Sequence, residues 1–302
     1  MDDTRKGCVV EDPIGDLPIG TTIEFNLITP IVSDAVRYPQ TVNNWDYFQG
    51  ALLALVIKTA DETHIFGTAF MIAPGLAITA THVVYDFKGI IESGKVAFSC
   101  MGIRKECIEL WKVTSITFNE IDDICLLLVS AASSVSESHK FYRFGLTTRA
   151  PKNDEIIQIF GFREHQSKMS TSSCQFTIDL FASSGIVTAV YPHGRGKTYM
   201  PYPVIELDCG SLCGMSGGIG IDKNGLIIGV ISRGMDTEDQ CGPTYLSWII
   251  GALEKEVFPT WPNGLYSGVN QLINFDERLL YIDRRDAIIN DNGAGKYSIW
   301  FE

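Results

Sequence analysis

The chain has 302 residues, of which 45% are hydrophobic and 20% charged, and its formal net charge is -12. This composition is typical of a well-packed globular protein, because disordered chains carry too little apolar surface to bury. The negative charge, with no long Lys/Arg run, argues against a nucleic acid or an anionic membrane as partner.

The N-terminus and the cysteines predict the compartment. Residues 1–6 are polar and lead into no apolar segment, which predicts no secretory signal, and the apolar runs are too short to span a bilayer. We therefore expect a cytoplasmic protein whose eight cysteines are mostly free thiols. Zinc binding by Cys209, Cys213 and Cys241 is an alternative, but no C-x-x-C pair supports it, so we predict no metal and no cofactor.

Strand-like segments begin near residue 49, after a proline-containing stretch (1–48) that is predicted to form an N-terminal arm. Short β-branched and aromatic runs then alternate with turn residues, which is typical of strands. A Ser/Ala-rich linker (131–138) divides the series. The predicted strands are 51–59, 64–73, 75–79, 96–100, 108–113, 115–118, 124–130, 155–162, 174–181, 185–191, 204–207, 217–221 and 226–233.

Many short strands with few helical patterns predict an all-β fold of barrels or a sandwich. Residues 222–225, Asp-Lys-Asn-Gly, predict a hairpin turn, because Asn-Gly adopts positive φ at low steric cost. Residues 245–258 carry apolar side chains at helical spacing and predict a C-terminal helix. Residues 259–302 are predicted to form a C-terminal extension of unknown role.

Ser216 lies between glycines in the run Gly-Met-Ser-Gly-Gly at 214–218, where the backbone can turn tightly and approach a substrate closely. The same run fits the nucleophile elbow of α/β-hydrolases. That fold needs its histidine after the serine, whereas all five histidines here precede Ser216. The order histidine, aspartate, serine remains possible.

His82 is the histidine best placed for catalysis, because two apolar strands and a tight turn in 67–81 lead directly to it. The acid should lie between His82 and Ser216. Asp123 directly precedes the apolar run 124–129, where a carboxylate can be buried and still accept the imidazole Nδ1–H. Asp122 is the alternative, since one residue of register changes the face of a strand.

The segments around His82, Asp123 and Ser216 resemble the three signature blocks of trypsin-like peptidases, T-A-x-H, D-I-x-L-L and G-x-S-G-G. Residues 184–189 and 229–232 resemble the bacterial HtrA-type branch, although no PDZ-sized segment follows. The resemblance implies two six-stranded antiparallel β-barrels with the active site between them. The protease domain would span 49–258, with the first barrel at about 49–131 and the second at about 140–244.

The resemblance also implies a serine endopeptidase that uses a His82–Asp123–Ser216 triad and an acyl-enzyme. The N–H groups of Gly214 and Ser216 would form the oxyanion hole. An uncharged P1 side chain is expected, because Gly210 stands where a pocket for basic side chains needs an acid. The guanidinium of Arg233 would attract acidic positions of the substrate. The implied substrate-binding residues are Gly210, Ser211, Ser232, Arg233, Gly234 and Gly242.

Met215 departs from the family pattern, which usually has Asp or Asn before the serine. A thioether is only a weak acceptor, so the loop 210–215 could need a partner to order it, or apolar packing of Met215 could hold it. We therefore expect a regulated protease acting on a specific protein or peptide substrate, with an activating protein or ligand. The alternative is a catalytically silent, protease-fold binding module.

Overall fold

The structure of the chain is a computed structural model. It describes residues 4–15, 17–30, 36–59, 63–89, 97–118, 122–169, 173–235, 241–284, 287–293 and 296–301. Strands dominate these ranges, and helix α1 (Thr81–Tyr85) has only five residues. None of the helices in these ranges is long and apolar enough to cross a membrane.

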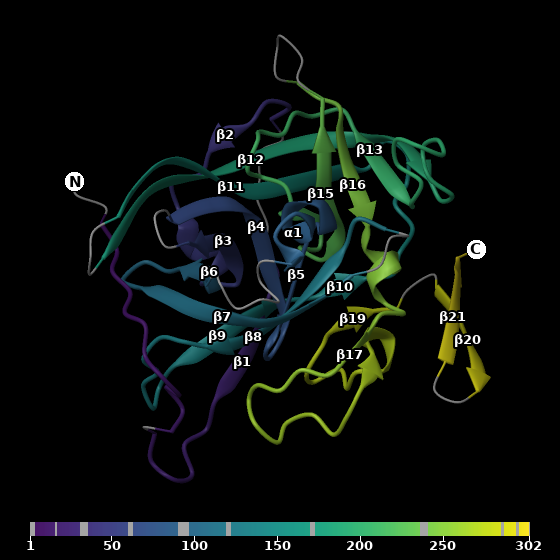
Figure 1. The fold of residues 1–302 in the computed structure, drawn as a ribbon. Coiled ribbons are helices and arrows are strands. Elements are labelled where there is room, and N and C mark those ends of the chain that lie inside the picture. The colour runs from purple at the N-terminus through teal and green to yellow at the C-terminus, as the bar shows by residue number, and fades with distance from the viewer. Residues whose placement is uncertain are drawn as a thin grey trace.

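The first barrel is closed and antiparallel, with the strand order β3-β4-β5-β8-β7-β6 (Figure 1). The predicted strands 108–113 and 115–118 form one strand, β7, with a bulge between Val113 and Ser115. The bulge shifts the register and explains the break in the apolar alternation there. The strands are β3 (Leu52–Lys58), β4 (Thr63–Ala73), β5 (Leu76–Thr79), β6 (Ala97–Ile103), β7 (Ile108–Thr117) and β8 (Cys125–Ala131).

The second barrel is built from six strands of a larger sheet, in the order β14-β11-β12-β13-β16-β15, and the pairing of β14 with β15 closes it. The predicted strands 174–181 and 185–191 form the single strand β12, which makes a long hairpin with β11. The strands are β11 (Ile156–Met169), β12 (Cys174–Tyr191), β13 (Val204–Leu207), β14 (Ile219–Ile221), β15 (Ile227–Gly234) and β16 (Thr244–Trp248). The double barrel confirms the predicted fold.

One apolar core joins the two barrels. A single cluster of buried side chains includes Leu53 and Phe70 of the first barrel and Phe160 and Leu246 of the second. Burial of each such side chain contributes about 1.5–3 kcal/mol to folding. Because the barrels share this core, groups at their junction are held in a fixed relation.

Segments of the predicted arm pair with strands that lie much later in the chain. Strand β1 (Glu24–Ile28) pairs in parallel with β9 (Lys140–Phe144), and β2 (Gln40–Thr41) pairs with β12. The short 3-10 helix η1 (Trp45–Phe48) follows and buries Phe48 in the core. The described part of the arm therefore lies against both halves of the molecule (Figure 1).

The predicted helix at 245–258 is wrong. The structure has strand β16 up to Trp248, then the 3-10 helix η2 (Ile249–Ala252) and the short strand β17 (Glu256–Val257). All residues of β16 are buried, on both faces of the strand. Of the apolar residues at helical spacing, Leu246 lies in β16, Ile249 in η2 and Val257 in β17. The spacing therefore arises from separate short elements that each bury apolar side chains.

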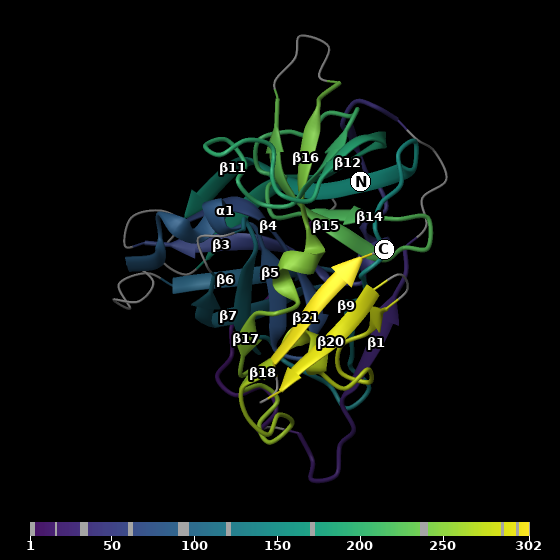
Figure 2. The ribbon, with the colours of Figure 1, turned by 90° about the vertical axis from the view of Figure 1, so that its right-hand side faces the viewer.

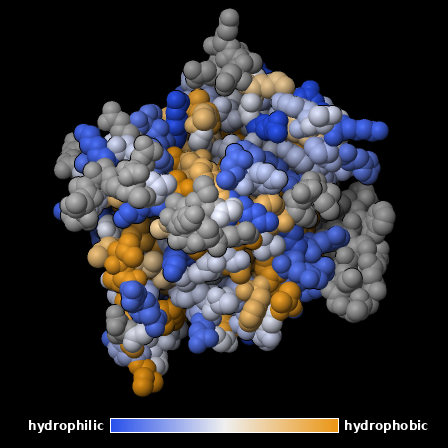
Figure 3. Space-filling model, viewed as in Figure 1, coloured by the Kyte–Doolittle hydropathy of each residue, from blue (hydrophilic) through white to orange (hydrophobic). Residues whose placement is uncertain are grey.

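The C-terminal extension consists of short elements beside the barrels (Figure 2). Strand β19 pairs with β10 at the edge of the large sheet, and β20 and β21 form a hairpin. In the coloured part of the face shown in Figure 3, apolar side chains gather most toward the lower left, and the upper right is mostly hydrophilic. Strand β10 (Leu146–Thr147) precedes the second barrel in the chain. The elements of the extension are β18 (Asn270–Gln271), η3 (Leu272–Asn274), β19 (Ile282–Asp283), β20 (Ala287–Gly293) and β21 (Lys296–Phe301).

Candidate active site

His82 lies on helix α1, which begins shortly after the end of β5, at the junction of the barrels. Its Nδ1 is 2.8 Å from Asp123 Oδ2, and its backbone N–H donates to Asp123 Oδ1 over 2.9 Å. The carboxylate can only accept, so a neutral ring carries its proton on Nδ1 and leaves Nε2 as an acceptor. The His82 side chain is 40% exposed and that of Asp123 only 6%, so a buried acid orients an accessible base.

Asp123 has a further partner from the second barrel. The Ser232 hydroxyl donates to Asp123 Oδ2 over 2.5 Å, and Tyr202 Oη is 3.0 Å from Ser232 Oγ. Because Ser232 gives its single proton to the carboxylate, Tyr202 donates to Ser232. Ser232, predicted as a substrate-binding residue, therefore hydrogen-bonds to the Asp123 carboxylate. Tyr202, which supports Ser232, was indicated by no sequence pattern.

Asp122 points away from this network. Lys255 Nζ donates to Asp122 Oδ1 over 2.8 Å, and both side chains are almost fully buried. Burial raises the pKa of Asp122, and the charge of Lys255 opposes that rise. Of the two alternatives left open by the sequence, Asp123 is therefore the residue that contacts His82.

Ser216 sits where the second barrel touches the first. Its carbonyl accepts a hydrogen bond from the Thr68 N–H over 2.9 Å. The next residue, Gly217, has a φ of +81°, and a Cβ there would lie 2.1 Å from Thr68 O and 2.2 Å from Thr79 Oγ1. Glycine is thus required by both conformation and space. Among the described residues, no hydrogen bond joins Ser216 Oγ to His82 Nε2.

The predicted oxyanion hole is a tight turn. Met215 N donates to Leu212 O over 3.0 Å, and Gly214 at the third position has a φ of +98°. These features define a type II turn, which fixes the direction of the peptide between Cys213 and Gly214. In the part of the chain that the structure describes, the N–H groups of Gly214 and Ser216 donate to no protein acceptor.

Met215 anchors this turn by packing. Its side chain is fully buried, and its Sδ accepts a hydrogen bond from Leu212 N over 3.2 Å. A Cβ on Gly161 of β11 would lie 2.6 Å from Met215 Cα, so a glycine there lets the loop approach the strand. Of the two expectations for the loop, this geometry favours apolar packing.

The other predicted substrate-binding residues line two facing segments. A Cβ on Gly234 would lie 2.4 Å from Ser211 Oγ, and one on Gly242 would lie 2.1 Å from Cys209 O. Gly210 is fixed between them, because its carbonyl accepts a hydrogen bond from Ser183 Oγ over 2.5 Å. These close approaches bring Ser211 next to Gly234 and Cys209 next to Gly242, and the preference for an uncharged P1 side chain stays a prediction.

Arg233 is exposed at the end of β15, where it pairs with Tyr245 of β16. Its guanidinium lies 5.2 Å from the centre of the Tyr199 ring, within the range of a cation–π contact. This contact holds the Arg233 side chain against the surface, next to Ser232 in the chain.

The cysteines form no cluster suited to a metal. All eight are free thiols, and no group of three His, Cys, Asp or Glu side chains in the described ranges could hold a metal ion. Burial raises the pKa of Cys209 to about 12, whereas Cys213 is exposed. The zinc alternative therefore has no support in these ranges.

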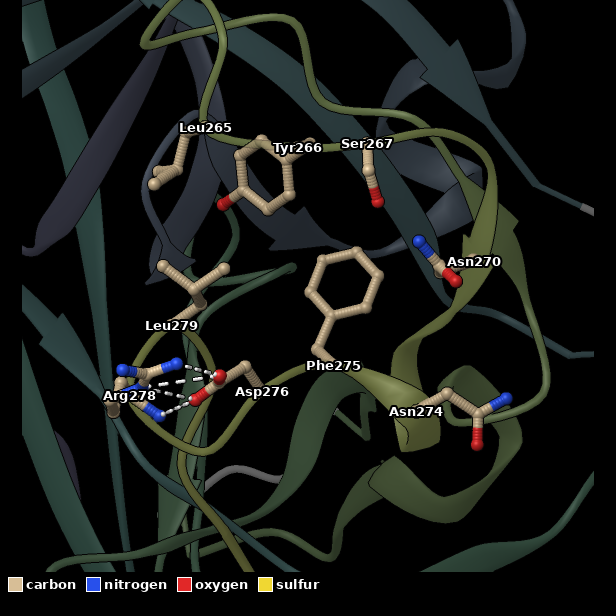
Figure 4. Close-up of a pocket in the computed structure, with 9 residues that line it drawn as sticks. All are labelled: Leu265, Tyr266, Ser267, Asn270, Asn274, Phe275, Asp276, Arg278 and Leu279. Carbon is tan, nitrogen blue, oxygen red and sulfur yellow. Dashed lines mark hydrogen bonds and ion pairs between the residues drawn. The ribbon is translucent and has the colours of Figure 1, made fainter.

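A cavity of about 590 Å³ lies in the C-terminal extension, away from the candidate triad. Tyr266 borders it and fastens the extension to the first barrel, donating to Pro74 O over 2.5 Å. An exposed ion pair between Asp276 and Arg278 closes one side (Figure 4). None of the predicted site residues borders this cavity.

The chain matches a family of known proteins over residues 67–230, the trypsin-like peptidase domain. No curated protein sequence is similar enough to match. Among solved structures, the fold is similar to Deg5, with 16% identity and a TM-score of 0.42 over 61% of this chain and 80% of that one. The active form of the Rv3671c protease from M. tuberculosis matches with 16% identity and a TM-score of 0.46, over 73% and 87%. A serine-to-alanine mutant of that protease, in its inactive form, matches with 16% identity and a TM-score of 0.43, over 74% of this chain and 94% of that one.

Proposed function

Because the chain belongs to the trypsin-like peptidase domain family, we propose that it is a serine endopeptidase. The observation that carries the proposal is the pair His82 and Asp123, joined over 2.8 Å, beside the Ser216 loop. A half-exposed imidazole oriented by a buried carboxylate is the arrangement that a general base requires.

In the proposed reaction, His82 Nε2 removes the proton of Ser216 Oγ while the oxygen attacks the scissile carbonyl carbon. The Gly214 and Ser216 N–H groups stabilise the oxyanion, and His82 then returns the proton to the leaving amine. Water hydrolyses the acyl-enzyme by the same steps and restores Ser216. Asp123 keeps the imidazole in the required tautomer and stabilises its cation.

The competing proposal is a protease-fold module that captures a partner without cutting it. The observation in its favour is that no hydrogen bond joins Ser216 Oγ and His82 Nε2 within the described ranges. Catalytic hydrogen bonds are often long in ligand-free enzymes and tighten when substrate binds. We therefore favour the peptidase.

The test is labelling with a fluorophosphonate probe together with cleavage of labelled casein. We expect the wild-type chain to react at Ser216 and to digest casein, and the Ser216→Ala variant to do neither while its thermal unfolding stays unchanged. Binding of casein without labelling or cleavage would favour the binding module.

Control by an activating protein or ligand remains a prediction, as does the cytoplasmic location. Burial of Met215 supports a loop that is formed without help. Active-site titration of the purified protein measures the competent fraction directly. A low fraction that rises when cell extract is added would favour an activator, and full titration of the isolated protein would exclude the need for one.

A further inference from the structure

Thr68, on β4 of the first barrel, is a fully buried polar residue that lies against the Ser216 loop of the second barrel. Its hydroxyl donates to Gly214 O over 3.2 Å and accepts a hydrogen bond from Phe162 N over 2.9 Å. Because the Phe162 N–H already occupies one lone pair, the hydroxyl proton is left for the Gly214 carbonyl. The Thr68 hydroxyl therefore donates one hydrogen bond and accepts one, and both cross the junction between the barrels.

The backbone of Thr68 holds the same loop at a second point. Its N–H donates to Ser216 O over 2.9 Å. The two carbonyls bound by Thr68 flank the peptide that carries the Ser216 N–H, and the Gly214 N–H lies directly before them. Thr68 thus fixes both ends of the stretch that presents the proposed oxyanion-hole donors.

The remaining bonds of the loop stay within the second barrel. Met215 N donates to Leu212 O, Gly218 N to Met215 O, and Gly217 N to Ile231 O. In the ranges that the structure describes, Thr68 is the residue of the first barrel that hydrogen-bonds to residues 212–217. These local bonds shape the turn, whereas Thr68 sets its position relative to His82.

Met215 provides no strong polar anchor of its own. Its thioether, a weak acceptor, bonds to Leu212 inside the turn and does not reach the first barrel. The polar link between the turn and the barrel that carries the base therefore runs through Thr68.

We propose that Thr68 is a positioning residue for the proposed peptidase reaction, because its hydroxyl keeps the Gly214 and Ser216 N–H groups directed at the developing oxyanion. The inference rests on the proposed function. Such donors act mainly on the transition state, so their displacement lowers kcat and leaves KM nearly unchanged. Complete loss of one donor lowers kcat roughly 10²–10³-fold, and we expect a partial displacement to cost about 10–100-fold.

The experiment compares Thr68→Val, which keeps the shape but removes the hydroxyl, with Thr68→Ser, which keeps the hydroxyl. The substrates are tetrapeptide p-nitroanilides with Ala, Leu or Phe at P1, and the inhibitor is the aldehyde of the best substrate. We expect the valine variant to lose kcat as above and to bind the aldehyde correspondingly more weakly, with KM unchanged. The serine variant should retain both kcat and aldehyde affinity.

Thr148→Val is the matched control. Thr148 is also fully buried, and its hydroxyl donates to Asp283 O over 3.1 Å, in strand β19 of the C-terminal extension and not in the Ser216 loop. It should lower the urea midpoint as Thr68→Val does, without a change in kcat. If Thr68→Val does not fold, Thr68→Cys replaces it, because a thiol is a weak donor and should give a kcat below that of the serine variant.

The outcomes separate the two proposals. A wild-type chain that neither labels with fluorophosphonate nor cleaves any peptide would end the proposed function and this inference together. An active wild type with equal kcat in the valine and serine variants, or with a rise in KM instead, would overturn the role of Thr68 alone. A cysteine variant as active as the serine variant would do the same.

Discussion

The two barrels contribute to the candidate site in different ways. The first supplies side chains, His82 and Asp123, which hold each other through bonds of 2.8 and 2.9 Å. The second supplies the Ser216 hydroxyl on a backbone turn, which Gly214 and Gly217 shape with φ of +98° and +81°. Side chains can be oriented by their own partners, whereas a turn of this kind needs support from the structure around it. Substitution of a single side chain should therefore disable the His82–Asp123 pair, whereas loss of a supporting contact should disable the turn that carries Ser216.

The neighbouring aspartates show the same contrast on a smaller scale. Asp123 faces His82 and belongs to the chemistry, while Asp122 faces Lys255 and ties the first barrel to the segment after the second. Two carboxylates next to each other in sequence thus have separate roles, which substitution can distinguish.

The largest effect is expected from Asp123→Asn. An amide in that position favours the wrong imidazole tautomer, so turnover at neutral pH should fall by roughly four orders of magnitude. Peptide hydrolysis by the purified variants measures this effect. Asp122→Asn is the matched control and should keep turnover within a few-fold. The reverse result would mean that the catalytic register is shifted by one residue.

The next effect concerns stability and comes from Lys255→Met. It leaves the buried Asp122 carboxylate without its counter-charge, which should lower the free energy of unfolding by about 3–5 kcal/mol. Urea denaturation measures the loss. Burial raises the pKa of Asp122, so the folded variant binds a proton more readily than the unfolded chain, and its deficit should shrink as the pH falls from neutral. The double variant Asp122→Asn/Lys255→Met should recover part of the loss, and a double variant weaker than the single one would contradict this account.

Much of the fold could be predicted from the sequence, because the strands follow apolar runs and turn residues. The Asp222–Gly225 turn is an example, with Gly225 at a φ of +74° and a Gly225 N to Asp222 O bond of 2.9 Å. The predicted helix at 245–258 failed because its apolar spacing is spread over β16, η2 and β17, and partners such as β13, which pairs with β16, are distant in the chain. Short-range patterns cannot tell a series of short buried elements from one helix.

The same distinction between local patterns and contacts distant in the chain applies to the candidate site. The residues of the proposed triad could be named because each lies in a local motif. Thr68 and Tyr202 could not, since their roles depend on bonds to Gly214 and Ser232, which are 146 and 30 residues away in the chain. Polar residues inside apolar strands were the available signal, and Thr68, buried in the middle of β4, was one of them.

The smallest effect should come from Arg233, which tests whether the second barrel also contributes a side chain to recognition. Arg233 and Gly234 of β15 pair with β16 on one side, so an extended substrate could add to their other edge and pass the exposed guanidinium. An exposed ion pair contributes at most about 1 kcal/mol, which is roughly fivefold in kcat/KM. Peptides with Glu in place of Gln near P1 should be cleaved faster by that factor, and salt should reduce the preference. Arg233→Gln should remove it without slowing the Gln peptide. An unchanged Glu preference in the variant would show that recognition on this side uses the backbone of β15 alone.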